Sequence, residues 1–223
     1  MTDLPPPRVV WITGAGGLIG SHLLKTAPSF APHVRAVGLT RHDVDLTDFT
    51  TVRQRFLSDR PAAVIHCAAL SKTTTCQADP DLARLINIDA TRHLAELAAE
   101  IPLLFFSTDL VFDGSKGNYV ETDLVNPLSV YAETKVIGEQ LVLANPRHTV
   151  LRTSLNFGYT TGGNRAFNEE MVQAWRSGRT LNLFVDEFRN PIAASVTARA
   201  VWELLYLNRP GLYHLAGSER LSR

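Results

Sequence analysis

The fold of this 223-residue chain is decided by one stretch, Arg8-Val9-Val10-Trp11-Ile12-Thr13-Gly14-Ala15-Gly16-Gly17-Leu18-Ile19-Gly20. Its first part is mostly apolar and predicts a strand over 8–13, and the periodic pattern from Leu18 to Thr26 predicts a helix. A helix that starts on a glycine-rich turn presents free N–H groups and a positive dipole end to an anion. The order strand, glycines, helix therefore predicts a pyrophosphate site for a dinucleotide.

The glycines of this turn have separate tasks. Gly14 can supply the tight turn, Gly17 lets the backbone approach a pyrophosphate, and Gly20 lets the helix pack on the strand. The alternative is a glycine-rich turn that binds nothing. We expect the cofactor to contact Gly14, Gly16, Gly17, Leu18, Ile19 and Gly20.

Alternation of strands and helices continues beyond this stretch. Near-continuous apolar runs predict strands buried on both faces, as in a parallel sheet. The predicted strands are 8–13, 34–39, 63–67, 103–107 and 149–152, and the predicted helices are 18–26, 49–57, 82–100 and 129–143. This pattern predicts an α/β fold of the Rossmann type, a doubly wound parallel sheet.

The pattern loosens after Arg152. A polar loop over 160–165, a helix over 168–177 and short strands over 181–185 and 211–216 are expected there. We therefore predict a nucleotide-binding Rossmann domain over 1–155. Residues 156–223 are predicted to form a small C-terminal substrate lobe, incomplete or interleaved with the main domain, over the carboxyl ends of the strands.

Composition excludes several function classes. Lys plus Arg and Asp plus Glu both number 22, so the net charge indicates neither nucleic acid nor a membrane surface as a partner. No apolar run reaches the ~18 residues that a membrane helix needs, and no signal peptide is recognisable. The two cysteines, Cys67 and Cys76, are in no metal-ligand spacing, and no metal site is expected. We expect a cytoplasmic protein with free thiols.

The end of the second predicted strand indicates which dinucleotide binds. NAD enzymes place a carboxylate there for the ribose hydroxyls, whereas this chain has Arg41. The planar guanidinium can pair with a 2′-phosphate, which favours NADP(H), with NAD(H) still possible. A solvated surface arginine is the alternative, and Asp43 or Asp45 can instead meet a ribose or the adenine.

Five segments, in order, resemble one protein family. They are Thr13–Gly20, Asp43–Asp48, His66–Ala69, Ser107–Phe112 and Tyr131–Lys135. Together they resemble the extended short-chain dehydrogenase/reductases, in particular the dTDP-4-dehydrorhamnose reductase (sugar-nucleotide-binding) branch, over about 9–216.

The resemblance implies roles for particular positions. Asp45 and Leu46 would lie beside the adenine, and Cys67, Ala68 and Ala69 would line the cofactor. Thr108, Tyr131 and Lys135 would form a catalytic trio, with Tyr131 and Lys135 also touching the cofactor. Asn87 would support the site from a central helix.

The chemistry of the trio agrees with that implication. Tyr131 and Lys135 are four residues apart on a predicted helix, so they share one face. A bound nicotinamide would supply hydride to a carbonyl carbon, and Tyr131 would protonate the oxygen. We expect the lysine ammonium, together with the positive ring of an oxidised nicotinamide, to lower the tyrosine pKa. We expect Thr108 to donate a hydrogen bond to the same oxygen. His66, inside an apolar strand, is interpreted as a core residue rather than a base.

Departures from the family pattern narrow the activity. Related sugar-nucleotide dehydratases have a glutamate where this chain has Leu110, which argues against a 4,6-dehydratase. The rhamnose branch more often has a tyrosine at Leu110, a glycine at Ala132 and an aromatic residue near Leu155. These differences leave the identity of the sugar open.

Substrate contacts are expected from Thr108 and Asp109, from Asn156 and from Arg189, with Asn164 and Arg165 as weaker candidates. Arg189 can hold a diphosphate or pair with Asp186 or Glu187.

The leading prediction is an NADPH-preferring oxidoreductase of a nucleotide-linked 4-keto sugar, as in dTDP-rhamnose biosynthesis. Alternatives are another nucleotide-sugar reductase or epimerase, and a non-catalytic NADP-binding regulatory subunit resembling the methionine adenosyltransferase β-subunit. The partner would be a small nucleotide sugar, and a homodimer is possible.

Overall fold

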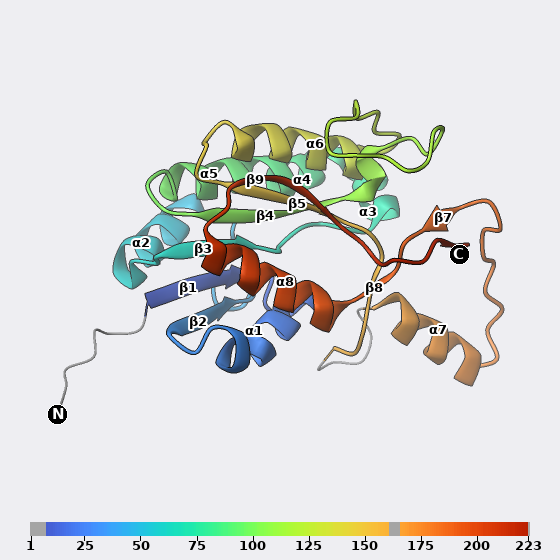
Figure 1. The fold of residues 1–223 in the computed structure, drawn as a ribbon, viewed down its shortest axis with the longest axis horizontal. Helices are drawn as coiled ribbons and strands as arrows, with labels where there is room; N and C mark the ends of the chain where they lie inside the picture. Colours follow the sequence, from blue (N-terminus) through green and yellow to red (C-terminus); the bar gives the residue numbers. More distant parts are fainter. Residues whose placement is uncertain (1–7, 161–165, 223) are drawn as a thin grey trace.

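Six parallel strands form the centre of the fold (Figure 1). The computed structural model describes residues 8–160 and 166–222. The strand order is β2-β1-β3-β4-β5-β9. The strands are β1 (Arg8–Thr13), β2 (Val34–Leu39), β3 (Ala63–His66), β4 (Leu103–Thr108), β5 (Thr149–Thr153) and β9 (Gly211–Leu215). The predicted Rossmann-type parallel sheet is confirmed, and the five strands predicted before residue 155 agree within one residue at each end.

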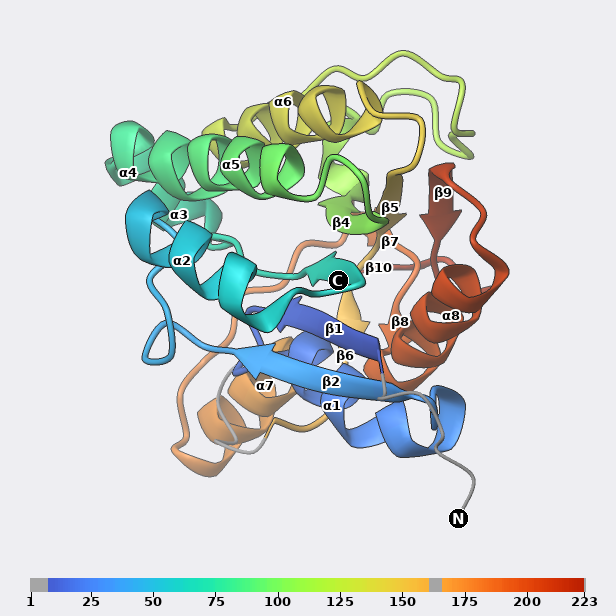
Figure 2. The same ribbon diagram turned by 90° about the vertical axis from the view of Figure 1, so that its left-hand side faces the viewer.

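Helices cover both faces of this sheet (Figure 2). One layer contains α1 (Leu18–Phe30) and α8 (Ala194–Leu207), which pack on each other. The other layer contains α2 (Phe49–Asp59), α5 (Ala90–Leu97) and α6 (Val130–Leu143). Each layer buries its own apolar cluster against the strands, the first around Leu23, Ala198 and Trp202 and the second around Leu94 and Val142. Because both faces are covered, the strands read as continuous apolar runs in the sequence.

The helix predicted over 82–100 is a composite. The helix α3 (Thr73–Ala78) precedes α4 (Pro80–Arg84), which continues through a π-helical turn, Leu85–Asp89, into α5. Asn87 lies in that turn, and its carbonyl accepts a hydrogen bond from the Thr91 hydroxyl at 2.7 Å. Such turns rotate the side chains that follow them and are frequent at functional sites.

The chain after residue 155 contributes both to the main sheet and to a group of elements beyond the carboxyl ends of its strands. α8 and β9 return to the main sheet, where β9 pairs with β5. Beyond the carboxyl ends of the strands are α7 (Phe167–Arg176), a pair formed by β6 (Asn156–Phe157) and β8 (Ile192–Ala193), and a pair formed by β7 (Phe188–Arg189) and β10 (Leu221–Ser222). No helix in the described part is long and apolar enough to cross a membrane.

One predicted element of this region is wrong. Residues 181–185 form no strand and run outside the sheets, between α7 and β7 (Figure 1). A strand requires a neighbour to take its backbone hydrogen bonds, and this apolar run has none among the described strands. Of the loop expected over 160–165, only Thr160 belongs to the described residues, so Asn164 and Arg165 lie outside them.

The order of the sheet places the ligand crevice. β1 lies between β2 and β3, so the direction of winding reverses at β1. Open α/β sheets bind ligands outside the carboxyl ends of the strands at such a reversal. The segments that follow β1 and β3 therefore line the expected crevice.

Candidate active site

The glycine turn after β1 packs closely on its inner side and is open on its outer side. Gly14 has a φ of +67°, and a Cβ there would lie 2.7 Å from the backbone nitrogen of Ala68. A Cβ on Gly20 would lie 2.5 Å from the carbonyl oxygen of Gly14, so helix and turn pack at backbone contact. A Cβ on Gly17 would meet only that same carbonyl, at 3.2 Å, among the described residues. The outer side of the turn is therefore open.

The N-terminus of α1 adds charge to this cradle. Gly17 precedes the helix, and the first turn of the helix contains no acidic residue. The positive end of the helix dipole is thus not neutralised locally, which favours a bound anion such as a pyrophosphate. Leu18 and Ile19 are half-buried in the first turn of α1, and Ile19 packs against the core cluster around Leu23.

The segment after β2 presents one exposed cation. The Arg41 side chain is 78 % exposed, and its Nε lies 3.4 Å from an Asp45 carboxylate oxygen. Asp43 is occupied by the turn itself, because it accepts from the backbone and the hydroxyl of Thr40. Asp45 similarly accepts from Thr47, which holds its pKa below the usual range. Leu46 packs against the core cluster of α2 and α5.

The segment after β3 is tied to the glycine turn. The Thr13 hydroxyl lies 2.7 Å from His66 Nδ1 and accepts a 3.3 Å hydrogen bond from the backbone of Ala68. His66 Nε2 lies 3.0 Å from the Thr91 hydroxyl. Burial lowers the pKa of His66 to about 3, so this histidine is a neutral, hydrogen-bonded core residue, as interpreted from the sequence. Cys67, Ala68 and Ala69 follow it at the crevice, where burial raises the pKa of the Cys67 thiol.

The candidate trio comes together at the ends of β4 and α6. Thr108 is the last residue of β4, and α6 starts on Ser129, whose hydroxyl caps the backbone N–H of Ala132. Tyr131 is in the first turn of α6 and interacts with the Thr108 hydroxyl. Lys135 follows one turn later, 3 % exposed, with Nζ 3.8 Å from the centre of the Phe105 ring.

Burial is the largest influence on the pKa values of Tyr131 and Lys135. Burial raises the pKa of Tyr131 to about 12, and the Asp109 carboxylate acts in the same direction. Burial lowers the pKa of Lys135 to about 7, whereas the Glu139 carboxylate acts to raise it. In the protein alone, desolvation of the phenolate outweighs the neighbouring charges. The expected lowering of the tyrosine pKa includes the charge of an oxidised nicotinamide and stays a prediction.

Asn87 supports this site from the π turn. Its amide accepts a 2.8 Å hydrogen bond from the backbone of Leu70 and donates to the carbonyl of the same residue at 3.1 Å. It also donates to the Thr134 hydroxyl on α6 at 3.0 Å. Asn87 thus joins the segment after β3 to the helix that carries Tyr131 and Lys135.

The predicted substrate residues are engaged with one another or with the protein. Asp109 receives a two-pronged ion pair from Arg189, which also contacts Glu187. The Ser154 hydroxyl donates to Asp109 as well, at 2.6 Å. Asn156 uses its amide internally, accepting from Thr197 at 2.6 Å and donating to the carbonyl of Ser154 at 3.0 Å.

A buried polar network behind the trio escaped the sequence analysis. It joins Ser107, Glu139 and Arg152, all no more than 6 % exposed. In the sequence, the one indication of this network is that Glu139 lies one helical turn beyond Lys135 on the same helix. Its partner, Arg152, lies on β5, and nothing in the local sequence indicates that pairing.

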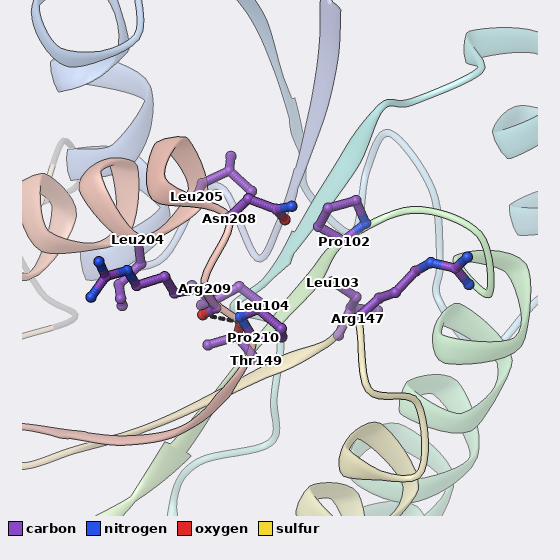
Figure 3. Close-up of a pocket in the computed structure, with 10 residues that line it drawn as sticks. All are labelled: Pro102, Leu103, Leu104, Arg147, Thr149, Leu204, Leu205, Asn208, Arg209 and Pro210. Carbon is purple, nitrogen blue, oxygen red and sulfur yellow. Dashed lines mark hydrogen bonds between the residues drawn. The ribbon is translucent and has the colours of Figure 1, made fainter.

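The small hollow in Figure 3 lies away from this crevice, at the amino ends of β4 and β5. Its volume of about 10 Å³ is room for about one water molecule. It is lined by Pro102, Leu103, Leu104, Arg147, Thr149, Leu204, Leu205, Asn208, Arg209 and Pro210.

Comparison with known proteins covers nearly the whole chain. The family described as "RmlD substrate binding domain" matches residues 8–223. A dTDP-4-keto-6-deoxy-D-glucose reductase from Streptomyces niveus is 32 % identical over 208 residues, covering 91 % of this chain and 70 % of the relative. Methionine adenosyltransferase 2 subunit beta from Xenopus laevis is 30 % identical over 236 residues, covering 98 % of this chain and 70 % of the relative.

A solved structure agrees with this match. The dTDP-4-dehydrorhamnose reductase from Bacillus anthracis, in complex with NADP, superposes with a TM-score of 0.88 at 26 % identity. The superposition covers 96 % of this chain and 76 % of that structure.

Proposed function

This chain belongs to the RmlD substrate binding domain family, and from that membership and the site geometry we propose that it is an NADPH-preferring reductase of a nucleotide-linked 4-keto sugar. The observation that carries the proposal is the position of Tyr131 and Lys135. Both lie on one face of α6, and Tyr131 interacts with Thr108 at the end of β4. Only β3 separates β4 from β1, the strand that leads into the glycine turn.

The glycine turn and its surroundings fit a nicotinamide dinucleotide. Gly14, Gly16, Gly17 and Gly20 would hold the pyrophosphate, with Leu18 and Ile19 beside it. Asp45 and Leu46 would lie at the adenine, and Cys67, Ala68 and Ala69 would line the middle of the cofactor. Lys135 would hold the nicotinamide ribose. The bound cofactor would supply a hydride to the substrate carbonyl.

Tyr131 is suited to supply the proton in this reduction. With a pKa raised to about 12, the phenol keeps its proton at neutral pH. An alkoxide that forms at the carbonyl oxygen is a stronger base than a phenolate, so the proton passes from Tyr131 to that oxygen. Thr108 would donate a hydrogen bond to the same oxygen and orient it. A charged Lys135 would stabilise the phenolate left behind.

The cofactor preference rests on Arg41. Its guanidinium is exposed and has one weak contact, with Asp45, so it is free to turn toward a 2′-phosphate. The substrate side of the crevice would be formed by Thr108 and Asp109, with Asn156 and Arg189 shaping it from the segments beyond β5.

A second candidate function is a cofactor-binding subunit without turnover. The observation in its favour is the 30 % identity to methionine adenosyltransferase 2 subunit beta over 98 % of this chain. The intact trio favours the reductase.

One experiment separates these proposals. Fluorescence of the three tryptophans is followed while NADPH or NADH is added, and NADPH absorbance is then followed with a panel of dTDP- and UDP-linked 4-keto sugars. Tight NADPH binding with steady oxidation on one sugar supports the reductase and names its substrate. Binding without oxidation on any sugar favours the subunit. Absence of binding overturns the cofactor site.

A further inference from the structure

We propose that Glu139 is a positioning residue that keeps Lys135 of the candidate active site protonated, and that its carboxylate is held by Ser107 and by Arg152, whose positive charge partly offsets it. The catalytic role of this arrangement rests on the proposed function. The effect of Glu139 on Lys135 depends only on side chains of this chain.

The helix α6 places the two groups together. Tyr131, Lys135 and Glu139 follow at intervals of four residues, so they lie along one face of the helix. The side chains of Lys135 and Glu139 are both buried, with 3 % of each residue exposed. A carboxylate at this depth and spacing acts on the ammonium with little screening by water.

Three hydrogen bonds hold the Glu139 carboxylate. Arg152 donates from Nε to Oε1 at 2.9 Å and from Nη2 to Oε2 at 2.7 Å. The Ser107 hydroxyl donates to Oε1 at 2.5 Å. Two parallel N–H···O bonds from one guanidinium are the geometry in which arginine binds a carboxylate.

Arg152 is itself held from its other side. Its Nη1 lies 3.5 Å from the Glu121 carbonyl and 3.4 Å from His214 Nε2. Its guanidinium carbon lies 5.1 Å from the centre of the Phe112 ring. The carboxylate of Glu139 is thus held by Ser107 on β4 and by Arg152 on β5.

A buried ion pair of this kind is a costly way to stabilise a fold. Well-packed apolar residues of similar volume often stabilise as much or more, because both charges lose their hydration. The position of the pair next to a buried lysine of the candidate site gives it a use beyond packing.

The groups around Lys135 leave Glu139 as its one charged counterpart among the described residues. His66 at the end of β3 faces it as a neutral imidazole, because burial lowers the pKa of this histidine. Cys67, which follows β3, faces it as a neutral thiol, because burial raises the pKa of this cysteine. From β4 it meets the Phe105 ring. Burial lowers the pKa of Lys135 to about 7, and Glu139 is the largest influence in the opposite direction.

Direct titration of Lys135 tests the inference without cofactor or substrate. The chain has four lysines, so ¹³Cε-lysine labelling of the full chain yields four NMR signals, and loss of one in Lys135→Met assigns it. The midpoint of that signal is measured in wild type, Glu139→Gln, Arg152→Gln and Ser107→Ala. Circular dichroism establishes that each variant is folded.

The variants should shift the midpoint of the Lys135 titration in opposite directions. Glu139→Gln should lower the Lys135 midpoint by about one pH unit or more, because the attracting charge is lost. Arg152→Gln should raise it, because the amide still donates to Glu139 but no longer neutralises it. Ser107→Ala, which keeps both charges, should leave the midpoint within a few tenths of a unit. A purely structural network would not give opposite shifts for Glu139→Gln and Arg152→Gln.

Two results would overturn the inference. One is an unchanged midpoint in folded Glu139→Gln, and the other is a lowered midpoint in Arg152→Gln. The second is decisive alone if Glu139→Gln does not fold. If the midpoints move as expected while wild type reduces no sugar nucleotide, the proposed function fails and the inference on Lys135 stands.

Discussion

Arg189 donates two hydrogen bonds to the carboxylate of Asp109, from Nε at 2.7 Å and from Nη2 at 2.5 Å. The two residues are 80 positions apart in the sequence. The side chains of Arg189 and Asp109 are 11 % and 31 % exposed. Arg189 also contacts Glu187 at 3.3 Å, so two carboxylates share one guanidinium. Little of its charge is left for a diphosphate, and its main contact orders the residue next to Thr108.

A double-mutant cycle measures this pair. Asp109→Asn, Arg189→Gln and the double variant should give a coupling free energy of about 1–3 kcal/mol in urea unfolding, because a partly buried bidentate pair is weakly screened. The matched control is the exposed pair Arg199 and Glu203, 62 % and 55 % exposed, with an expected coupling of about 0.3–0.5 kcal/mol. Equal couplings in the two cycles would show that the Asp109 pair is only a surface contact.

Replacing Tyr131 by phenylalanine should separate chemistry from binding. Turnover should fall by about 10²- to 10⁴-fold, since the proton donor is lost, while NADPH binding stays near normal. The control is Tyr206→Phe, at a side chain that is 85 % exposed on α8, where turnover should match wild type. Steady-state rates and fluorescence titration supply both readouts, and full turnover in Tyr131→Phe would exclude this donor.

Arg41 should decide between the two dinucleotides. Arg41→Ala should raise the Kd for NADPH about tenfold, equivalent to about 1.4 kcal/mol, and leave the Kd for NADH unchanged. Arg35→Ala, at an exposed arginine earlier on β2, is the matched control for the loss of one charge. An equal loss of affinity for both dinucleotides in Arg41→Ala would contradict the 2′-phosphate role.

His66 should make the fold sensitive to acid. Its pKa is lowered from 6.5 to about 3 in the folded protein, so below pH 6.5 the unfolded chain binds a proton that the folded chain does not. The free energy of unfolding should therefore fall as the pH drops from 6.5 toward 3. His66→Gln should flatten this fall in urea titrations at pH 7.5 and 5.0, whereas His33→Gln, at an exposed histidine, should keep the wild-type slope.

Because Gly20 contacts the glycine turn, a substitution at Gly20 should lower both the stability of the fold and the affinity for NADPH. A Cβ there would lie 2.5 Å from the Gly14 carbonyl oxygen and 2.8 Å from Ala15 Cα, both backbone atoms. Gly20→Ala should cost about 1–3 kcal/mol and weaken NADPH binding, because the turn must shift. Gly117→Ala, with a φ of +70° and no atom within 4 Å, should lose about 1–2 kcal/mol with binding intact. NADPH titration of both variants distinguishes a shifted turn from simple loss of stability.

The sequence by itself determined the sheet, the glycine turn and the shared face of Tyr131 and Lys135. Each of these follows from local patterns: apolar runs for strands buried on both faces, glycines between a strand and a helix, and a spacing of four residues on a helix. For the same reason residues 181–185 were mistaken for a strand, because an apolar run does not reveal whether a neighbour will take its hydrogen bonds.

Only the tertiary structure decided the partners of the charged groups. Asp186 and Glu187 are near Arg189 in the sequence, yet the main partner of Arg189 is Asp109. Glu139 on α6 pairs with Arg152 on β5. The tertiary structure also decided that burial is the largest influence on the pKa of Tyr131. Charge partners and desolvation depend on which distant segments the fold brings together and how much water they exclude, and no local pattern in the chain encodes either quantity.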